Sequence, residues 1–178
     1  RNAVGKTLRT MVFFMFPLIF GLIAVSDQMI VVLLTEKWSP ASEYFKLLCL
    51  TGLFYIFQVV FGEILKTKGR LDWVLKLEVI TKTVMMISVL VTWRWGISAI
   101  IYGQMFTSAV AYVVGSYYVR KLIGYSFRQQ FNDVIVYFAL SVAMYLIVMV
   151  ISYFVNNPLV YLIIASLTGA VFYFFGAF

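Results

Sequence analysis

The sequence predicts an all-α membrane protein, a polytopic bundle of about six transmembrane helices. Hydrophobic residues make up 63% of the 178 positions and charged residues 12%, whereas soluble domains carry roughly a quarter charged residues. A chain this short cannot hide so much apolar surface from water, because its surface-to-volume ratio is high. The apolar residues also gather into runs close to the twenty or so that cross about 30 Å of hydrocarbon as a helix.

The composition also excludes several kinds of site. Histidine is absent and the one cysteine, Cys49, lies in an apolar stretch. Disulfides, zinc clusters and histidine-based catalysis are therefore not expected. The formal charge is +7, but the cations flank the apolar runs instead of gathering on one solvated face, so nucleic acid is not an expected partner. We expect no cofactor, no metal and no catalytic residue, with the lipid bilayer as a partner.

The first two apolar runs cover residues 8–34 and 41–65. A spanning segment has no water to satisfy its backbone, and these runs lack the alternation of barrel strands, so both are predicted as helices. Pro17 lies inside the first run, where the loss of one backbone hydrogen bond predicts a kink. Ser39-Pro40 supplies an N-cap and a proline at the first helical position, which predicts a tight turn between the helices.

The third run, residues 79–92, is the shortest. Its charge-free part cannot span a membrane alone, so we expect this helix to begin in an amphipathic segment near Leu71. In that segment acidic residues precede lysines by four positions, the favourable order for ion pairs on one helical face.

The fourth run covers residues 96–119 and carries a small residue at every fourth position. Such a face lets another helix approach closely where dispersion drives association, so this helix is expected to be buried against partners. A small-residue face can also line the sliding seam of a transporter. The predicted packing residues are Ala99, Gly103, Thr107, Ala111 and Gly115.

The last two runs cover residues 134–155 and 159–178, with Asn156-Asn157-Pro158 as a second capped turn. Orientation follows from the cations on alternate sides of the six predicted helices. One side holds only Lys37, Lys46 and Arg94 of the 14 lysines and arginines. Because the cation-rich side faces the cytoplasm, both termini of the segment are predicted to be cytoplasmic.

Asp27 is the most informative charge, because it lies about two turns before the outer end of the first helix, beside Gln28. A carboxylate inside a span costs at least ~2.5 kcal/mol on insertion scales, so it should face an aqueous cavity or the protein interior. The alternative is an ion pair with Arg94 or Lys37 from the outer turns, or a carboxylate that reaches the membrane interface. The candidate substrate or ion pathway residues are Asp27, Gln28, Gln58 and Gln104.

The chain contains a series of short local sequences in a characteristic order, most clearly from Val12 to Ser126. They are Phe16-Pro17-Leu18-Ile19, Leu33-Leu34-Thr35-Glu36-Lys37-Trp38, Leu47-Leu48-Cys49-Leu50-Thr51-Gly52, Leu65-Lys66-Thr67-Lys68-Gly69-Arg70, Trp95-Gly96-Ile97, Gly103-Gln104 and Lys121-Leu122-Ile123-Gly124-Tyr125-Ser126. This series resembles the polysaccharide flippases, the Wzx-type lipopolysaccharide biosynthesis proteins of the multidrug/oligosaccharidyl-lipid/polysaccharide exporter superfamily.

The resemblance implies a MATE-like fold of two six-helix lobes followed by two extra helices. Residues 1–119 would be the last four helices of the second lobe, and residues 120–178 the additional pair. The chain would then be the C-terminal portion of a transporter, with the missing N-terminal lobe as a partner.

The implied function is to flip an undecaprenyl-pyrophosphate-linked oligosaccharide from the cytoplasmic to the periplasmic leaflet of the bacterial inner membrane. The product would serve lipopolysaccharide, O-antigen or exopolysaccharide synthesis. No covalent bond changes, so no enzyme is implied. The alternatives are part of a multidrug or toxin cation antiporter, in which Asp27 would bind a cation or proton, and a membrane scaffold subunit of glycan assembly. A membrane-bound transferase would need a catalytic histidine or loop acid. It is not expected, because the chain has no histidine and its outer loops are short.

Overall fold

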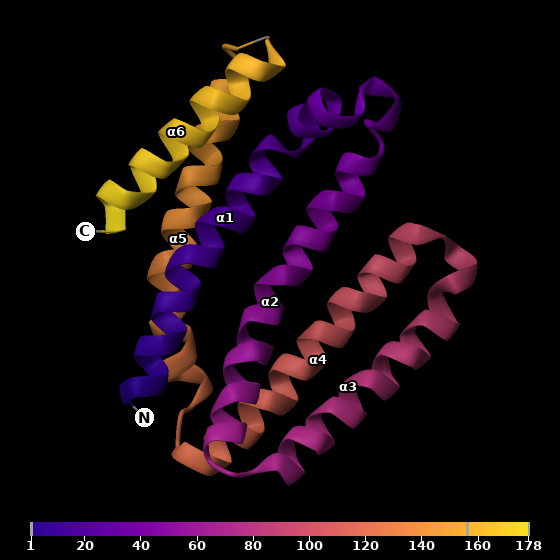
Figure 1. Cartoon of the computed structure of the whole chain (residues 1–178), viewed down its shortest axis with the longest axis vertical. Coiled ribbons are helices and arrows are strands. Elements are labelled where there is room, and N and C mark those ends of the chain that lie inside the picture. The colour runs from indigo at the N-terminus through magenta and orange to yellow at the C-terminus, as the bar shows by residue number, and fades with distance from the viewer. Residues whose placement is uncertain (1, 156, 178) are drawn as a thin grey trace. The chain divides into compact units, whose positions relative to one another are not determined.

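The computed structural model describes residues 2–155 and 157–177, and this part of the chain is all-α, as predicted (Figure 1). Its elements in order are α1 (Asn2–Leu34), η1 (Glu36–Trp38), α2 (Ala41–Thr67), α3 (Leu71–Thr92), η2 (Trp93–Trp95), α4 (Ile97–Ile123), α5 (Phe127–Ser152) and α6 (Pro158–Ala177). Each predicted helix has a counterpart, and α3 begins at Leu71 as its amphipathic lead-in predicted. Three residues used in these predictions, Arg1, Asn156 and Phe178, lie outside the described residues.

Five of the six described helices are long and apolar enough to cross a membrane. The candidate spans are Val4–Leu34, Ala41–Thr67, Ile97–Ile123, Phe127–Ser152 and Pro158–Gly176. By the same measure of length and composition α3 is not a span, although its 22 residues would extend about 33 Å. The reason is charge, because α3 carries Asp72, Lys76, Glu78 and Lys82.

The chain forms two compact units, and α1, α2 and α5 each contribute to both. The first unit consists of Arg1–Met11 and Leu50–Val134, and the second of Val12–Cys49 and Ile135–Phe178.

In the first unit α3 and α4 form an antiparallel pair joined by η2 (Figure 1). The turn ends at Gly96, whose φ of 87° is a conformation that favours glycine. A Cβ at position 103 would collide with the Ser88 hydroxyl of α3, so Gly103 allows close approach. On another face of α4, a Cβ on Gly115 would lie 3.0 Å from the ring of Phe61 in α2.

The other predicted packing residues of α4 follow the same pattern of burial. Thr107 and Ala111 are buried, and Ala99 is half-buried near the start of the helix. The Thr107 hydroxyl donates to the Gly103 carbonyl oxygen at 2.9 Å, so its polarity is satisfied within the helix. The small-residue stripe therefore lies where α4 packs within its own unit.

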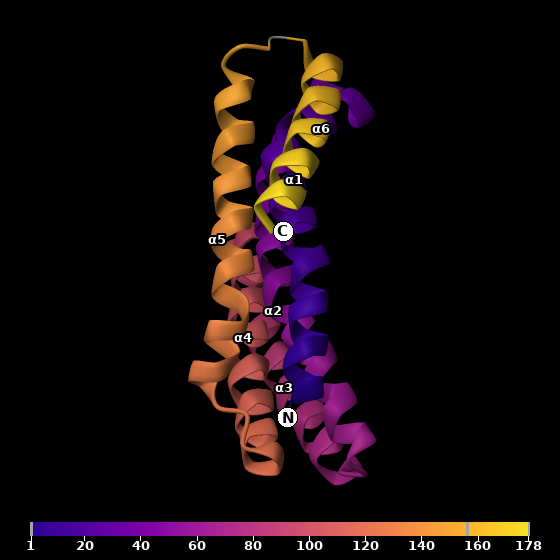
Figure 2. The ribbon, with the colours of Figure 1, turned by 90° about the vertical axis from the view of Figure 1, so that its left-hand side faces the viewer.

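In the second unit the latter part of α1 packs against α5 and α6, which run antiparallel (Figure 2). Tyr161 of α6 is 1% exposed, and its hydroxyl donates to the carbonyl oxygens of Ala24 (3.2 Å) and Val148 (3.4 Å). These two bonds link α6 to α1 and α5. They also satisfy the Tyr161 hydroxyl, whose burial without a partner would be costly. Pro17 lies within the continuous α1, and its kink stays a prediction.

Candidate functional site

Asp27 of α1 is paired with Lys46 of α2 in the second unit. The Lys46 ammonium lies 2.7 Å from each carboxylate oxygen, and Ser42 adds a side-chain hydrogen bond. The sequence pointed to cations in the outer turns, but the partner is Lys46, in the second turn of α2. The Asp27 side chain is still 53% exposed, which makes this pair a surface feature of the unit.

The three candidate glutamines, Gln28, Gln58 and Gln104, are half-buried. Within the described part of the chain, none has a side-chain hydrogen bond. Their amides can therefore bind another group, and their role in a transport pathway stays a prediction.

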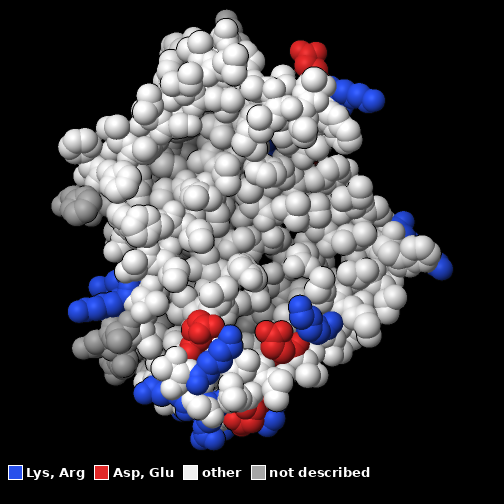
Figure 3. Space-filling model, viewed as in Figure 1, with Lys and Arg blue, Asp and Glu red and all other residues white. Residues whose placement is uncertain are grey.

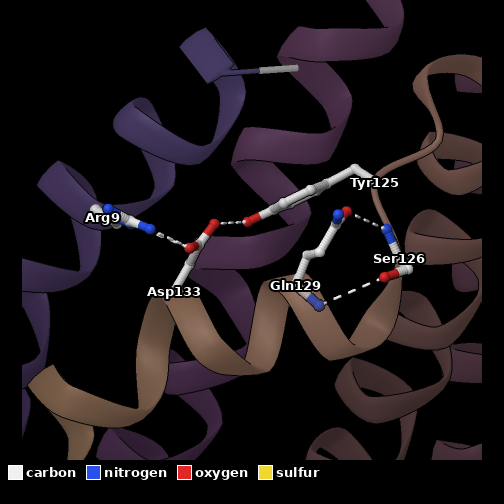
Figure 4. A network of polar contacts seen from close by, with 5 residues as sticks. All are labelled: Arg9, Tyr125, Ser126, Gln129 and Asp133. Carbon is white, nitrogen blue, oxygen red and sulfur yellow. Dashed lines mark hydrogen bonds and ion pairs between the residues drawn. The ribbon is translucent and has the colours of Figure 1, made fainter.

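The first unit contains a more enclosed carboxylate, Asp133 of α5, whose side chain is 12% exposed (Figure 4). Arg9 of α1 donates through Nη2 (2.5 Å) and Nε (3.1 Å) to Asp133 Oδ1. The hydroxyl of Tyr125 donates to Oδ2 at 2.6 Å. We call Arg9, Tyr125 and Asp133 the Asp133 cluster. It joins the start of α1 and the α4–α5 turn to α5, and it gives each carboxylate oxygen a partner.

The α4–α5 turn positions Tyr125 by local rules. Gly124 adopts a left-handed conformation (φ 70°) that ends α4, as glycine does at helix C-termini. A capping box then starts α5, because the Ser126 N–H donates to Gln129 Oε1 and the Gln129 N–H donates to Ser126 Oγ. Tyr125, held between them, is 3% exposed. Burial and the Asp133 carboxylate raise the pKa of Tyr125 far above its usual value, so its hydroxyl remains a donor.

Gln130, the residue after the capping box, is 1% exposed and ties α5 to α4. Its amide nitrogen donates to Ser116 Oγ (2.6 Å) and to the Tyr125 carbonyl oxygen (3.2 Å). Its amide oxygen accepts a bond from the Tyr112 hydroxyl at 3.2 Å. Buried polar networks of this kind specify one packing arrangement when every member is satisfied.

A polar hollow of about 430 Å³ lies beside the Asp133 cluster in the first unit. It is lined by Gly5, Lys6, Arg9, Tyr125, Gln129, Asn132 and Asp133. Charged side chains gather at this end of the unit, where α2 ends and α5 begins (Figure 3). No group of histidine, cysteine or carboxylate side chains suited to holding a metal occurs among the described residues.

Two stretches of the chain are similar to known proteins. Residues 1–43 match the model of a family described as polysaccharide biosynthesis protein. The resemblance to polysaccharide biosynthesis proteins is confirmed. A 57-residue stretch is also 37% identical to the teichuronic acid biosynthesis protein TuaB of Bacillus subtilis (strain 168). That stretch covers 32% of this chain and 12% of TuaB, and no solved structure matches the chain.

The segment that matches the polysaccharide biosynthesis family contains all of α1, η1 and the start of α2. It therefore contains Arg9, the cation of the Asp133 cluster, and Asp27, the carboxylate of the exposed pair with Lys46.

Sequence reasoning singled out Asp27 and missed the Asp133 cluster and Gln130. One local signal could have pointed to this region. Ser126 and Gln129 have the spacing of a capping box, which marks a helix start shortly before the charged Asp133. The partner of Asp133 was not readable, since Arg9 lies 124 positions away.

Proposed function

We propose that this chain is part of a polytopic membrane transporter that flips undecaprenyl-pyrophosphate-linked oligosaccharide from the cytoplasmic to the periplasmic leaflet for surface polysaccharide synthesis. The observation that carries the proposal is the polysaccharide biosynthesis match over α1, in a chain with five candidate membrane spans. Such a step moves a polar head across hydrocarbon and changes no covalent bond. A helix bundle with polar groups on selected faces suits this task better than it suits group transfer.

Within this proposal, residues 1–119 form the last four helices of the second lobe, and residues 120–178 form an additional pair. The α3 helix is the sixth span, with both termini of the segment in the cytoplasm. The antiparallel packing of α3 on α4 supports this topology, because a helix that packs along a spanning helix and returns to the same end crosses the same layer. The concentration of lysine and arginine beside α2, α3 and α4 supports the orientation.

The flipping step is tested by removing the gene that encodes the chain and analysing the lipid-linked glycans that accumulate. A transporter defect leaves completed oligosaccharide on its lipid carrier, accessible only from the cytoplasmic face of membrane vesicles. An incomplete glycan would indicate a transferase and overturn the proposal. Unchanged glycans combined with altered sensitivity to cationic drugs would instead support the antiporter.

The topology is tested with single cysteines in a Cys49→Ala background, since Cys49 is the chain's one native cysteine. Arg70→Cys probes the α2–α3 turn, Arg94→Cys the α3–α4 turn and Arg128→Cys the start of α5. If α3 spans, a membrane-impermeant maleimide labels position 94 from the outside and positions 70 and 128 only after permeabilisation. Labelling of 70 and 94 from the same side would mean that α3 does not cross.

A further inference from the structure

The polar hollow of the first unit offers more hydrogen-bond donors than acceptors. Lys6 contributes an ammonium that has no ion-pair partner among the described residues. Gln129 uses its amide oxygen to accept the Ser126 N–H, which leaves its amide N–H groups to donate. Asn132 adds a second, exposed amide. These groups favour a ligand that accepts hydrogen bonds.

The carboxylate in the wall does not cancel this preference. Both oxygens of Asp133 accept short bonds, from Arg9 and from Tyr125 (Figure 4). Its negative charge is balanced by Arg9 at 2.5 Å, so the charge of Lys6 remains as the net charge of the lining. The first turn of α5 adds the partial positive charge of a helix N-terminus on the same side. The hollow is therefore positive as well as rich in donors.

The depth of the hollow indicates what kind of anion reaches it. Lys6 lies two residues after the start of the Val4–Leu34 candidate span, and Gln129 two residues after the start of Phe127–Ser152. Each span is longer than the roughly 20 residues that cross the hydrocarbon, so its first turn lies at headgroup level. Phosphates of membrane lipids are concentrated in this layer, and anionic lipids attract nearby lysines.

We propose that this hollow binds the phosphate group of an anionic phospholipid, with Lys6, Gln129 and Asn132 as donors and the Asp133 cluster as the rigid wall. The volume of about 430 Å³ exceeds that of a single phosphate and leaves room for the glycerol of a headgroup. The site is independent of the transported cargo. It would attach a structural lipid at the junction of α1 and α5.

The test is a binding titration of the purified full chain in phosphatidylcholine nanodiscs that contain increasing phosphatidylglycerol, read by native mass spectrometry. Lys6→Gln should weaken phosphatidylglycerol binding about fivefold, the effect of one lysine near an anionic surface. Lys6→Arg should retain binding. The matched control is Lys68→Gln, which removes an exposed lysine of the α2–α3 turn outside the hollow and should leave binding unchanged.

Several results would overturn the proposal. Equal losses in Lys6→Gln and Lys68→Gln would mean that the lipid responds to general surface charge and not to the hollow. Unchanged binding in Lys6→Gln would remove the site altogether. Saturable binding of inorganic phosphate that displaces phosphatidylglycerol would assign the hollow to a free anion instead of a lipid. Far-UV circular dichroism of each variant verifies that its helices remain intact.

Discussion

Asp27 and Asp133 occupy similar places in the sequence, since each lies about two turns from the end of a candidate span, yet their surroundings differ. The Asp133 side chain is 12% exposed and receives bonds from Arg9 of α1 and Tyr125 of the α4–α5 turn, whereas the Asp27 side chain is 53% exposed and is held mainly by Lys46. An enclosed carboxylate with both oxygens paired suits a structural role. An exposed one retains the capacity to meet a substrate or ion.

The comparison teaches that a charge inside an apolar run is not by itself a functional signal. Both carboxylates lie within candidate spans and both have charged partners, but packing encloses the Asp133 side chain and leaves the Asp27 side chain 53% exposed. The predictions below separate these two roles, by stability for the enclosed site and by activity for the exposed one.

The largest expected effect is on stability at the enclosed site. Asp133→Leu leaves the buried Tyr125 hydroxyl without an acceptor and removes the charged bonds of Arg9, which should lower the free energy of unfolding by about 2–3 kcal/mol. Denaturation of the purified protein in mixed detergent micelles measures this. Asp27→Leu is the matched control, and an equal loss in both variants would erase the distinction between the two carboxylates.

The buried amide beside the Asp133 cluster should come next. Gln130→Leu keeps the volume but leaves Ser116 and the Tyr125 carbonyl oxygen without their partner, at a cost of about 2 kcal/mol. Gln58→Leu removes a half-buried amide that has no hydrogen bond in the described structure. The same denaturation measurement should find Gln58→Leu close to the parent protein, and a comparable loss there would show that Gln130 is not special.

Tyr125→Phe should have a smaller effect, about 1 kcal/mol, because one hydrogen bond is lost while Arg9 still balances Asp133. It should also change the pH dependence. The pKa of Tyr125 is raised in the folded state, so its contribution is complete below about pH 10, the ordinary tyrosine value, and is lost as pH rises further. Denaturation between pH 8 and pH 11 should therefore show the parent weakening relative to Tyr125→Phe, and parallel profiles would refute the assignment.

The smallest effect on stability is expected at the exposed pair. Asp27→Asn breaks an exposed ion pair and should cost less than about 1 kcal/mol. Cell-surface polysaccharide should nevertheless fall in cells expressing the complete transporter with this change, because Asp27 is the pathway candidate. Labelling of surface glycan, normalised to protein abundance by immunoblot, provides the readout. Normal display would remove Asp27 from the pathway.

Much of the helical structure could be predicted because its causes are local. The apolar runs, the two proline turns and the amphipathic start of α3 are each defined within a short stretch, and the structure has a helix at each apolar run. The small residues of α4 could be recognised by their spacing, whereas their neighbours Ser88 and Phe61 could not, since spacing on one helix does not identify the facing helix.

Composition and local pattern were sufficient for the membrane class and for the order of the helices, because apolar run length and turn chemistry act over a few residues. The resemblance of the chain's short local sequences to a known family pointed to polysaccharide biosynthesis. Only the tertiary packing shows that Asp133 is enclosed while Asp27 is exposed. Packing also places Arg9 beside Asp133, 124 positions away in the sequence, and forms the polar hollow. These features depend on which helix faces meet. Which faces meet is determined by close packing and by the need to pair every buried polar group. Both depend on several segments at once, so no single segment contains the information.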